Sequence, residues 1–360
     1  MPRLPPLPSV RELVRLYGLQ AKQQLSQNFL FDLNLCKKFA RQLAAATDEA
    51  LVTTAGELGR SSMPPVVLEV GPGPGGLTRT VLGLGGGSKA LVAVEKDPRF
   101  VPALAMLLQH AADASLPPGT EAAREGILLQ GGGAGRLCDT AKVVQDDVLR
   151  VDEHELLKGL AQELPMDHEE GACEVGVLGN LPFAVATELL LKWTAQVASG
   201  TGIGKFGRVP MVLSFQTEVA DRIFATPNSR KYGRLSVMTQ QWLQPELSFT
   251  IAAQNFVPPP KVNATVLRIV PRRQPLSPEP ITFHELEYLT RELFSQRRKV
   301  VSNVLASFVP AGGSNAALEL LKKAKIDGRK RPEHLGVEEF CSLTRHFMDA
   351  FRDKVSLPRV

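Results

Sequence analysis

Short apolar runs alternate with longer helix-forming stretches through the middle of the chain. The apolar runs predict strands over residues 66–70, 90–94, 141–144, 175–178 and 210–215. The stretches between and after them predict helices over residues 77–84, 98–111 and 186–197. Strands that alternate with helices imply a parallel sheet with helices on both faces. The predicted fold class is therefore α/β.

The pattern changes near residue 270. Residues 271–280 contain four prolines and predict a linker. Beyond it, apolar residues recur at helical spacing over 284–304, 316–324 and 337–354. We therefore predict an N-terminal arm over residues 1–30, an α/β domain over 31–270 and a small all-helical domain over 281–360.

Three further segments depart from the strand–helix alternation. Residues 1–8 are rich in proline and cannot begin a helix, whereas residues 10–21 could form one within the arm. Residues 112–135 and 200–207 are rich in glycine or contain a Pro-Pro-Gly turn. Both predict insertions in surface loops.

Length and composition narrow the class of protein. A chain of 360 residues fits two or three domains, and 44% apolar with 22% charged residues is the balance of a soluble globular protein. The four cysteines are far apart and the six histidines show no ligand spacing, so we expect no metal site and no disulfide scaffold. No continuous apolar run reaches the length of about 18 residues that a membrane-spanning helix needs.

The charge is unevenly distributed. Residues 1–40 carry six Lys/Arg and two acids, residues 281–360 carry fourteen and ten, and the whole chain has a net charge of +5. Both ends are therefore basic (+4 each) around a slightly acidic middle (5 − 4 − 4 = −3). This distribution suits a polyanionic partner that contacts both ends, although solvated surface charge would also account for it.

A glycine turn follows the first predicted strand. Gly71-Pro-Gly-Pro-Gly-Gly76 opens the next helix, and Glu95 stands at the end of the second strand. Glycines allow close approach of the backbone to a ligand, and a strand-end acid can accept hydrogen bonds from ribose hydroxyls. The pattern predicts a site for a nucleotide-type cofactor, although a plain strand–helix turn could also carry these glycines.

Two cofactor classes compete for this turn. A dinucleotide would place its pyrophosphate at the helix N-terminus, where backbone N–H groups bind phosphate. Pro72 and Pro74 remove two such donors, and Glu69 would repel a phosphate but suit the cationic amine of a methionine moiety. These residues favour S-adenosylmethionine.

The fourth predicted strand runs into Asn180-Leu-Pro-Phe183. The carboxyl ends of strands in open α/β sheets form the ligand-binding edge. An amide oxygen, a rigid backbone carbonyl and an aromatic ring are the groups needed to hold the exocyclic amine of a flat base. An Asx turn with a buried phenylalanine is the simpler alternative.

Several motifs together resemble the rRNA adenine N6-dimethyltransferases. They are LEVGPGPGGLT, VEKDPRF, QDDVL and GNLPF in that order, preceded by QNFL and followed by YGRLSV, FVPPPKV, QRRK and RPEHL. The resemblance covers about residues 10–350. It implies a Rossmann-like S-adenosylmethionine methyltransferase domain followed by a small helical domain. The proline-rich start and LQAKQQLSQNFL resemble the mitochondrial branch, whose members are also described as B-type mitochondrial transcription factors.

The resemblance assigns roles to individual residues. It implies a cofactor site formed by Asn28, Leu30, Gly71, Glu95, Lys96, Asp147, Val148 and Asn180. Asp147 would accept a hydrogen bond from the adenine ring of the cofactor, although neighbouring Asp146 leaves open which aspartate does so. It further implies that Asn180, Leu181, Pro182 and Phe183 bind the target adenine, with Phe256 as a second ring against the base.

The chemistry of adenine N6 explains why such residues would suffice. Its lone pair is delocalised into the ring, which makes it a poor nucleophile. Two acceptors, the Asn180 amide oxygen and the Leu181 carbonyl, would bind its two hydrogens, favour a pyramidal nitrogen and stabilise developing positive charge. Catalysis would then rest on positioning and electrostatics, without a general base.

Basic residues near the C-terminus predict contact with RNA phosphates. Residues 291–331 carry ten Lys/Arg and three acids, with clusters at Arg297-Arg298-Lys299 and Arg329-Lys330-Arg331. A solvated helix face is the alternative to a phosphate-binding surface.

The predicted function is N6,N6-dimethylation of adjacent adenosines in a small-subunit rRNA, in support of ribosome assembly. The predicted partner is the immature small ribosomal subunit, and the protein is expected to be a mitochondrial monomer without membrane association. One alternative is a nucleic-acid-binding transcription factor that uses a methyltransferase fold and acts with the mitochondrial transcription machinery. A nicotinamide-dependent oxidoreductase is a weaker alternative, because no acid/base pair for hydride transfer is evident.

Overall fold

The computed structural model describes residues 12, 27–51, 63–83, 88, 90–112, 127–130, 140–162 and 175–357. The chain divides into two compact units. The first comprises Met1–Leu189, Gly202–Thr217 and Glu246–Val270, and the second comprises Leu190–Thr201, Glu218–Pro245 and Pro271–Val360. The second unit therefore takes segments from the middle of the chain as well as its end, unlike the single boundary expected near residue 270. The helix expected over residues 10–21 lies outside the described residues, apart from Glu12.

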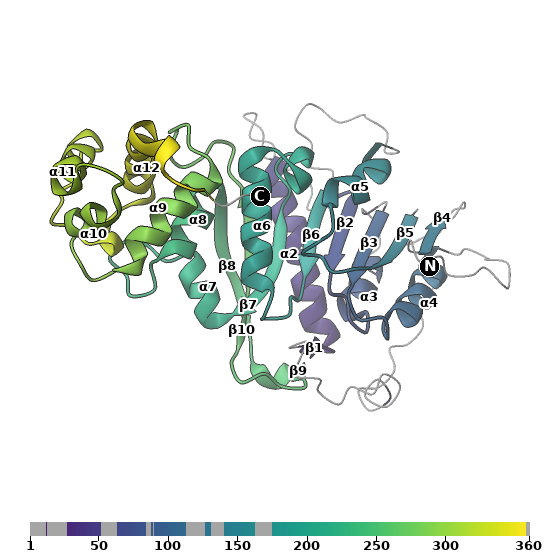
Figure 1. Ribbon diagram of the computed structural model, residues 1–360. Helices are drawn as coiled ribbons and strands as arrows, with labels where there is room; N and C mark the ends of the chain where they lie inside the picture. The colour runs from purple at the N-terminus through teal and green to yellow at the C-terminus, as the bar shows by residue number, and fades with distance from the viewer. Residues whose placement is uncertain are drawn as a thin grey trace. The chain divides into compact units, whose positions relative to one another are not determined.

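An eight-stranded sheet runs through the described residues (Figure 1). Its spatial order is β4 (Ile127–Gln130), β5 (Thr140–Gln145), β3 (Ala90–Glu95), β2 (Val66–Val70), β6 (Val175–Gly179), β7 (Met211–Gln216), β10 (Ala264–Pro271), β8 (Leu243–Ile251). The five central strands β5, β3, β2, β6 and β7 pair in parallel, as the sequence pattern predicted. The α/β fold class is thereby confirmed.

The two strands flanking this parallel block run antiparallel to it, β10 against β7 and β4 against β5. Strand β4 lies inside the segment 112–135 that was expected to be a loop insertion, so that expectation is wrong for residues 127–130. Residues 113–126 and 131–135 of the same segment lie outside the described residues.

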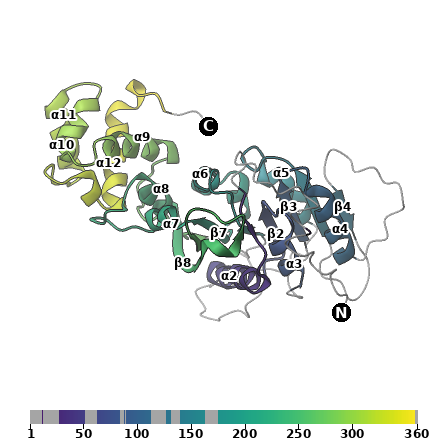
Figure 2. The same ribbon diagram turned by 90° about the horizontal axis from the view of Figure 1, so that it is seen from below.

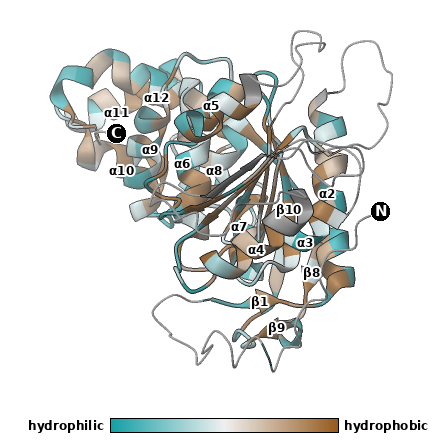
Figure 3. Cartoon of the chain, turned by 90° about the vertical axis from the view of Figure 1, so that its right-hand side faces the viewer, coloured by the Kyte–Doolittle hydropathy of each residue, from teal (hydrophilic) through white to brown (hydrophobic). Residues whose placement is uncertain are grey.

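Burial on both faces explains the composition of the central strands. Every residue of β2, β3 and β6 is buried, so these strands are nearly continuous apolar runs instead of alternating ones. Helices α2 (Leu33–Leu51) and α3 (Gly76–Gly83) lie on one face of the sheet and α5 (Glu153–Gln162) on the other (Figure 2). In Figure 3 the strands are mostly coloured as hydrophobic, whereas the helices show hydrophilic patches.

Helix α2, which the apolar pattern did not reveal, supplies much of the first core. Phe39 and Leu43 of α2 are fully buried in one cluster with Val67 and Leu91 of the sheet. Leu104 of α4 (Val101–Ala112) joins the same cluster. Each such side chain contributes about 1.5–3 kcal/mol by leaving water.

The second unit is helical. It contains most of α6 (Ala186–Ser199) and α7 (Thr217–Ile223), with α8 (Arg234–Trp242), α9 (Phe283–Ser295), α10 (Val301–Phe308), α11 (Gly313–Lys323) and α12 (Val337–Phe351). Its core contains Leu286, Leu289 and Leu293 of α9 with Phe340 and Phe347 of α12.

The helix predicted over residues 284–304 is in fact two. Helix α9 begins with a capping box in which Thr282 and Glu285 exchange hydrogen bonds, and it ends at Ser295, because the next residue, Gln296, has non-helical φ and ψ of −126° and 48°. The first N–H groups of α10 donate to tertiary partners, Val301 to the Lys330 carbonyl and Ser302 to that of Gly328. The chain is therefore not helical between residues 296 and 300. The spacing of apolar residues could not predict this break, because it accompanies contacts with residues distant in the chain.

The expected linker and the second expected insertion are also ordered. The Arg272 and Leu276 N–H groups donate to carbonyls of Trp242 and Gln241, both at 2.8 Å, so the segment 271–280 is fixed along α8 and is not a free linker. The segment 200–207 contains the short 3₁₀ helix η2 (Gly202–Phe206), in which Ile203 is buried. Three further 3₁₀ turns are η3 (Ala253–Asn255), η4 (Pro332–His334) and η5 (Arg352–Lys354).

Glu69 is an ionisable side chain in the centre of β2. It is 0% exposed, and burial raises its pKa to about 8, against a smaller lowering from Thr78. The folded state therefore holds the proton more tightly than the unfolded chain, so stability falls as the pH rises from about 4.3 to the raised pKa of about 8.

We predict that Glu69→Gln flattens this pH dependence, because glutamine has no proton to lose. Urea unfolding at about pH 5 and about pH 8 should show a clear loss of stability for the wild type and a smaller loss for the variant. Exposed Glu319 gives a control, and Glu319→Gln should follow the wild type. An equal loss of stability between the two pH values in Glu69→Gln and in the wild type would contradict the assignment of this pH dependence to Glu69.

Candidate active site

Three strand ends meet at one edge of the sheet. Strand β2 lies between β3 and β6, and the chain extends from β3 to β5 on one side and from β6 to β7 on the other. The order of the strands thus reverses between β2 and β6, which is where open α/β sheets form a ligand crevice. Gly71 follows β2, Glu95 ends β3 and Asn180 follows β6.

The glycine turn is shaped by its backbone and fixed by Glu95. Gly71 and Gly73 have φ values of 63° and 54°, in the left-handed region that favours glycine. A Cβ on Gly73 would lie 2.7 Å from the Phe29 ring, so a larger residue would displace that ring. The Gly73 N–H donates to Glu95 Oε2 at 2.9 Å, and the Asp97 N–H donates to Glu95 Oε1 at 2.8 Å. Burial raises the pKa of Glu95, and these two hydrogen bonds oppose the shift.

The arm at residues 27–30 closes over this turn. Strand β1 (Phe29–Leu30) pairs antiparallel with β9 (Phe256–Val257), which joins the arm to a loop far along the chain. The Gln27 side chain donates to Asp97 at 3.4 Å, and the Asn28 carbonyl accepts a hydrogen bond from the Asn180 amide at 2.9 Å. The arm is thus connected to the ends of both β3 and β6.

These elements enclose a cavity of about 40 Å³. It is lined by Gln27, Asn28, Phe29, Leu30, Gly71, Pro72, Pro74, Gly76, Leu77, Glu95, Asn180 and Pro182. Five of the predicted cofactor residues are among them, namely Asn28, Leu30, Gly71, Glu95 and Asn180. The lining also includes Gln27 and Phe29, which the sequence did not predict as site residues. They adjoin Asn28 and Leu30 in the chain, which it did predict.

The other predicted cofactor residues are Lys96, which follows β3, and Asp147 and Val148, which follow the neighbouring strand β5. Lys96, Asp147 and Val148 are not part of the cavity lining, although Gln145 of β5 is in register with Glu95. The Asp147 carboxylate accepts from Lys96 at 2.7 Å and from the Leu149 N–H at 3.1 Å. The hydrogen bond from Lys96 is the main cause that lowers the pKa of Asp147, which keeps it anionic. Asp146 instead accepts from the Asp147 N–H at 2.6 Å.

Glu69 does not have the role that the sequence suggested. Its side chain is fully buried and does not line the cavity, and its pKa of about 8 leaves it mostly protonated at neutral pH. It therefore offers no exposed negative charge to a cationic amine.

The predicted base-binding residues differ in exposure. Asn180, Pro182 and Phe183 are half-buried, while Leu181 is 3% exposed. Among the residues that the structure describes, the Leu181 carbonyl accepts no hydrogen bond, so it is available as an acceptor. Phe256 is 2% exposed and belongs to the core with Leu30, its partner in β1, so its ring offers no open face to a base.

Sequence reasoning missed Ser214, which had no recognisable catalytic context. Its hydroxyl donates to Asn180 Oδ1 at 2.8 Å. Only the pairing of β7 with β6 brings the two residues together, so no local signal could have found the contact.

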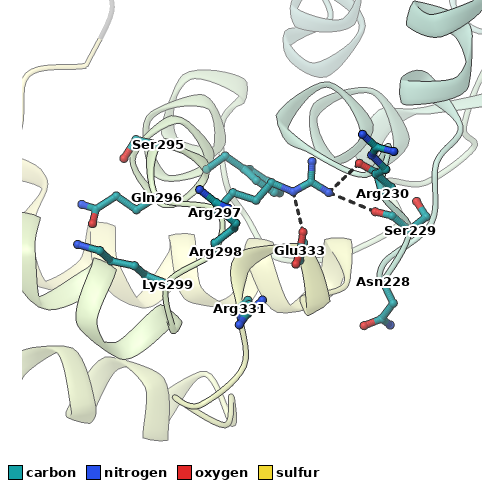
Figure 4. A pocket seen from close by; sticks show the side chains of 11 residues that line it. Asn228, Ser229, Arg230, Ser295, Gln296, Arg297, Arg298, Lys299, Arg331 and Glu333 are labelled. Atoms are coloured by element: carbon teal, nitrogen blue, oxygen red, sulfur yellow. Dashed lines mark hydrogen bonds and ion pairs between the residues drawn. The ribbon is translucent and has the colours of Figure 1, made fainter.

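The second unit has a basic groove of about 920 Å³ (Figure 4). It is lined by Asn228, Ser229, Arg230, Phe294, Ser295, Gln296, Arg297, Arg298, Lys299, Arg331 and Glu333. Four of the six predicted RNA-binding residues line it, whereas Arg329 and Lys330 do not. Arg329 forms an ion pair with Asp327 at 3.2 Å, and Lys330 forms one with Glu339 at 2.7 Å.

The described residues contain no group of three or more His, Cys, Asp or Glu side chains placed to hold a metal ion. None of their helices combines the length and apolarity needed to cross a membrane.

Comparisons with known proteins agree on one family. Residues 18–113 and 137–349 match the family described as Ribosomal RNA adenine dimethylase. The mitochondrial dimethyladenosine transferase 1 of Vermamoeba vermiformis is 41% identical over 354 residues, or 96% of this chain and 95% of that protein. The ribosomal RNA small subunit methyltransferase A of Rhizobium etli is 37% identical over 343 residues, or 95% and 98%.

A solved structure supports the fold. A crystal structure of a dimethyladenosine transferase from Plasmodium falciparum superimposes with a TM-score of 0.57 at 17% sequence identity, covering 88% of this chain and 95% of that one. At this identity the likeness concerns the fold alone.

The fold is that of a Rossmann-like methyltransferase, and the matched family consists of methyltransferases that use S-adenosylmethionine. The chain belongs to the ribosomal RNA adenine dimethylase family. It is an enzyme that dimethylates adenine in ribosomal RNA, and it is a mitochondrial member of the family. The predicted family, cofactor, activity and location are thereby confirmed, and an oxidoreductase is set aside.

Proposed function

We propose that the cavity at the strand ends binds S-adenosylmethionine and that the Asn180-Leu-Pro-Phe183 turn presents adenine N6 to it, for two successive methylations of adjacent adenosines in small-subunit rRNA. The observation that carries the proposal is the hydrogen-bonded Asn180 amide at the lining of the cavity. The name of the Rhizobium relative supports the small subunit as the partner, and modification at this stage would support its assembly.

The residues present suit the cofactor chemically. Glu95 offers a carboxylate to ribose hydroxyls, and the glycine turn allows close approach of a ligand, as Gly71 has no Cβ. Asp147 and Val148, at the neighbouring strand end, would hold the adenine ring of the cofactor, with Lys96 beside them. When bound, S-adenosylmethionine supplies an electrophilic methyl group.

The chain's own residues act on the target base by positioning and electrostatics. The Asn180 amide oxygen and the Leu181 carbonyl would accept the two N6 hydrogens, which favours a pyramidal nitrogen and stabilises its developing charge. Half-buried Phe183 would stack on the base once the adenine has left its helix. Phe256 would support the arm through β9 instead of stacking.

We propose that the groove of the second unit contacts rRNA phosphates. Arg298, Lys299 and Arg331 line it, are exposed and have no ion-pair partner among the described residues. Arg230, which sequence reasoning did not select, has the same properties.

Arg297 differs from these four cations. Its guanidinium bonds to Glu333 at 2.7 Å and to the carbonyls of Ser229 and Arg230 at 3.3 Å and 2.9 Å (Figure 4). It therefore joins the walls of the groove, while the other cations remain available to phosphate.

Glu95→Ala should weaken cofactor binding about a hundredfold, because two charge-assisted hydrogen bonds to ribose correspond to about 3 kcal/mol. Calorimetry with S-adenosylmethionine measures this change. Glu155→Ala, which removes an exposed carboxylate from α5 of the same unit, is the matched control and should bind normally. Unchanged affinity in folded Glu95→Ala would place the ribose elsewhere.

Asn180→Ala should lower the rate of methyl transfer about a hundredfold to a thousandfold, the usual cost of losing a preorganised group at the reacting centre. RNA affinity should change little, because the side chain is half-buried at a sheet edge, and the rate is compared at saturating cofactor because Asn180 also lines the cavity. Mass spectrometry of the rRNA adenines measures product, and exposed Asn303→Ala is the control. Near-normal dimethylation by Asn180→Ala would refute the proposed turn. Full rescue of a deletion strain by an inactive Asn180→Ala would instead favour the transcription-factor function.

Replacing Arg298, Lys299 and Arg331 together with alanine should weaken RNA binding and reduce its log–log salt slope by about 2–3, since each lost phosphate contact contributes about 0.7–0.9. Cofactor binding should be unaffected. Arg329→Ala removes an arginine that is paired with Asp327 outside the groove, and it should leave the slope unchanged. An equal effect of both variants, or an unchanged slope in the triple variant, would locate the RNA elsewhere.

A further inference from the structure

Ser214 is a buried hydroxyl residue beside the proposed catalytic amide. It lies in β7 and is 0% exposed. Strands β6 and β7 are parallel neighbours, with Gly179 in register with Leu213, so Ser214 stands next to the residue that follows β6. Its Oγ lies 2.8 Å from Asn180 Oδ1.

The partners of the Asn180 amide determine which way it points. The Asn28 backbone carbonyl can only accept a hydrogen bond, so the group 2.9 Å from it must be the amide nitrogen. The amide oxygen therefore faces Ser214, and the Ser214 hydroxyl must be the donor. One lone pair of the oxygen is then occupied and one remains for a hydrogen of the target amine.

We propose that Ser214 is a positioning residue for methyl transfer, because it holds the Asn180 amide with its oxygen directed at adenine N6. With the Asn28 contact alone, the amide could rotate about a single hydrogen bond. The second contact, at the opposite end of the amide, fixes both its rotation and its place. A rotated amide would present N–H donors to the N6 hydrogens and repel them. This role rests on the proposed function of Asn180.

Steady-state methylation by Ser214→Ala tests the proposal. We expect kcat to fall about tenfold, as for one lost neutral hydrogen bond at a positioned group. KM for RNA and the affinity for S-adenosylmethionine should stay within about twofold of wild type, since Ser214 is not among the residues that line the proposed cofactor cavity. Ser214→Thr keeps the donor and should restore most of kcat.

Thr265→Val is the matched control. Thr265 is 1% exposed in β10, which pairs with β7, and its hydroxyl bonds to Thr217 at 3.0 Å and not to Asn180. The variant removes a buried hydroxyl from the neighbouring strand and should leave kcat unchanged. An equal fall of kcat in Thr265→Val and Ser214→Ala would overturn the proposal, because it would show a general effect on the sheet. If Ser214→Ala does not fold, Ser214→Cys can replace it in this test, because cysteine is close to serine in size but is only a weak hydrogen-bond donor.

A double-mutant cycle separates positioning from structural support. If Ser214 acts through Asn180, adding Ser214→Ala to Asn180→Ala should cause no further loss of rate. The same tenfold loss in both backgrounds would overturn the proposed role. If Asn180→Ala is slow and Ser214→Ala is normal, only the role of Ser214 fails. If Asn180→Ala itself is normal, the proposed function of the turn fails with it.

Discussion

The parallel pairing of β2 with both β3 and β6 is the constraint on which the site depends. Val70, the last residue of β2, is in register with Val94 and with Gly179. Because the three strands point the same way and end together, the glycine turn, Glu95 and Asn180 reach one edge although they are far apart in the sequence. Complete burial of these strands holds the register, since slippage would move apolar side chains out of both packed faces.

The arm at residues 27–30 connects the cavity at the strand ends with the Asn180 turn. Through Phe29 it packs on the glycine turn, through β1 it pairs with β9, and through the Asn28 carbonyl it holds the Asn180 amide. Asn28 thus lines the cavity and also contacts the Asn180 side chain.

Charge pairing divides the basic residues of the second unit into two groups. Arg329 and Lys330 are paired with nearby carboxylates, and Arg297 bonds to Glu333 and two carbonyls, so part of the charge of these three is already compensated within the protein. Arg298 and Lys299 are exposed by the turn that separates α9 from α10. The break in the helix thus creates the surface that is available to a polyanion.

The sequence by itself predicted the parallel strands and the family. It also located the glycine turn, Glu95 and the Asn180 turn at strand ends, because apolar periodicity and strand-end motifs are local properties. It also indicated the basic clusters, but not which of their members are paired. The tertiary structure alone decided that Ser214 contacts Asn180, that Phe256 is buried, that Arg230 joins the groove, and that residues 284–304 form two helices. Each of these depends on partners distant in the chain, and the hydrogen bonds and burial that fix them arise only when the strands and helices have packed.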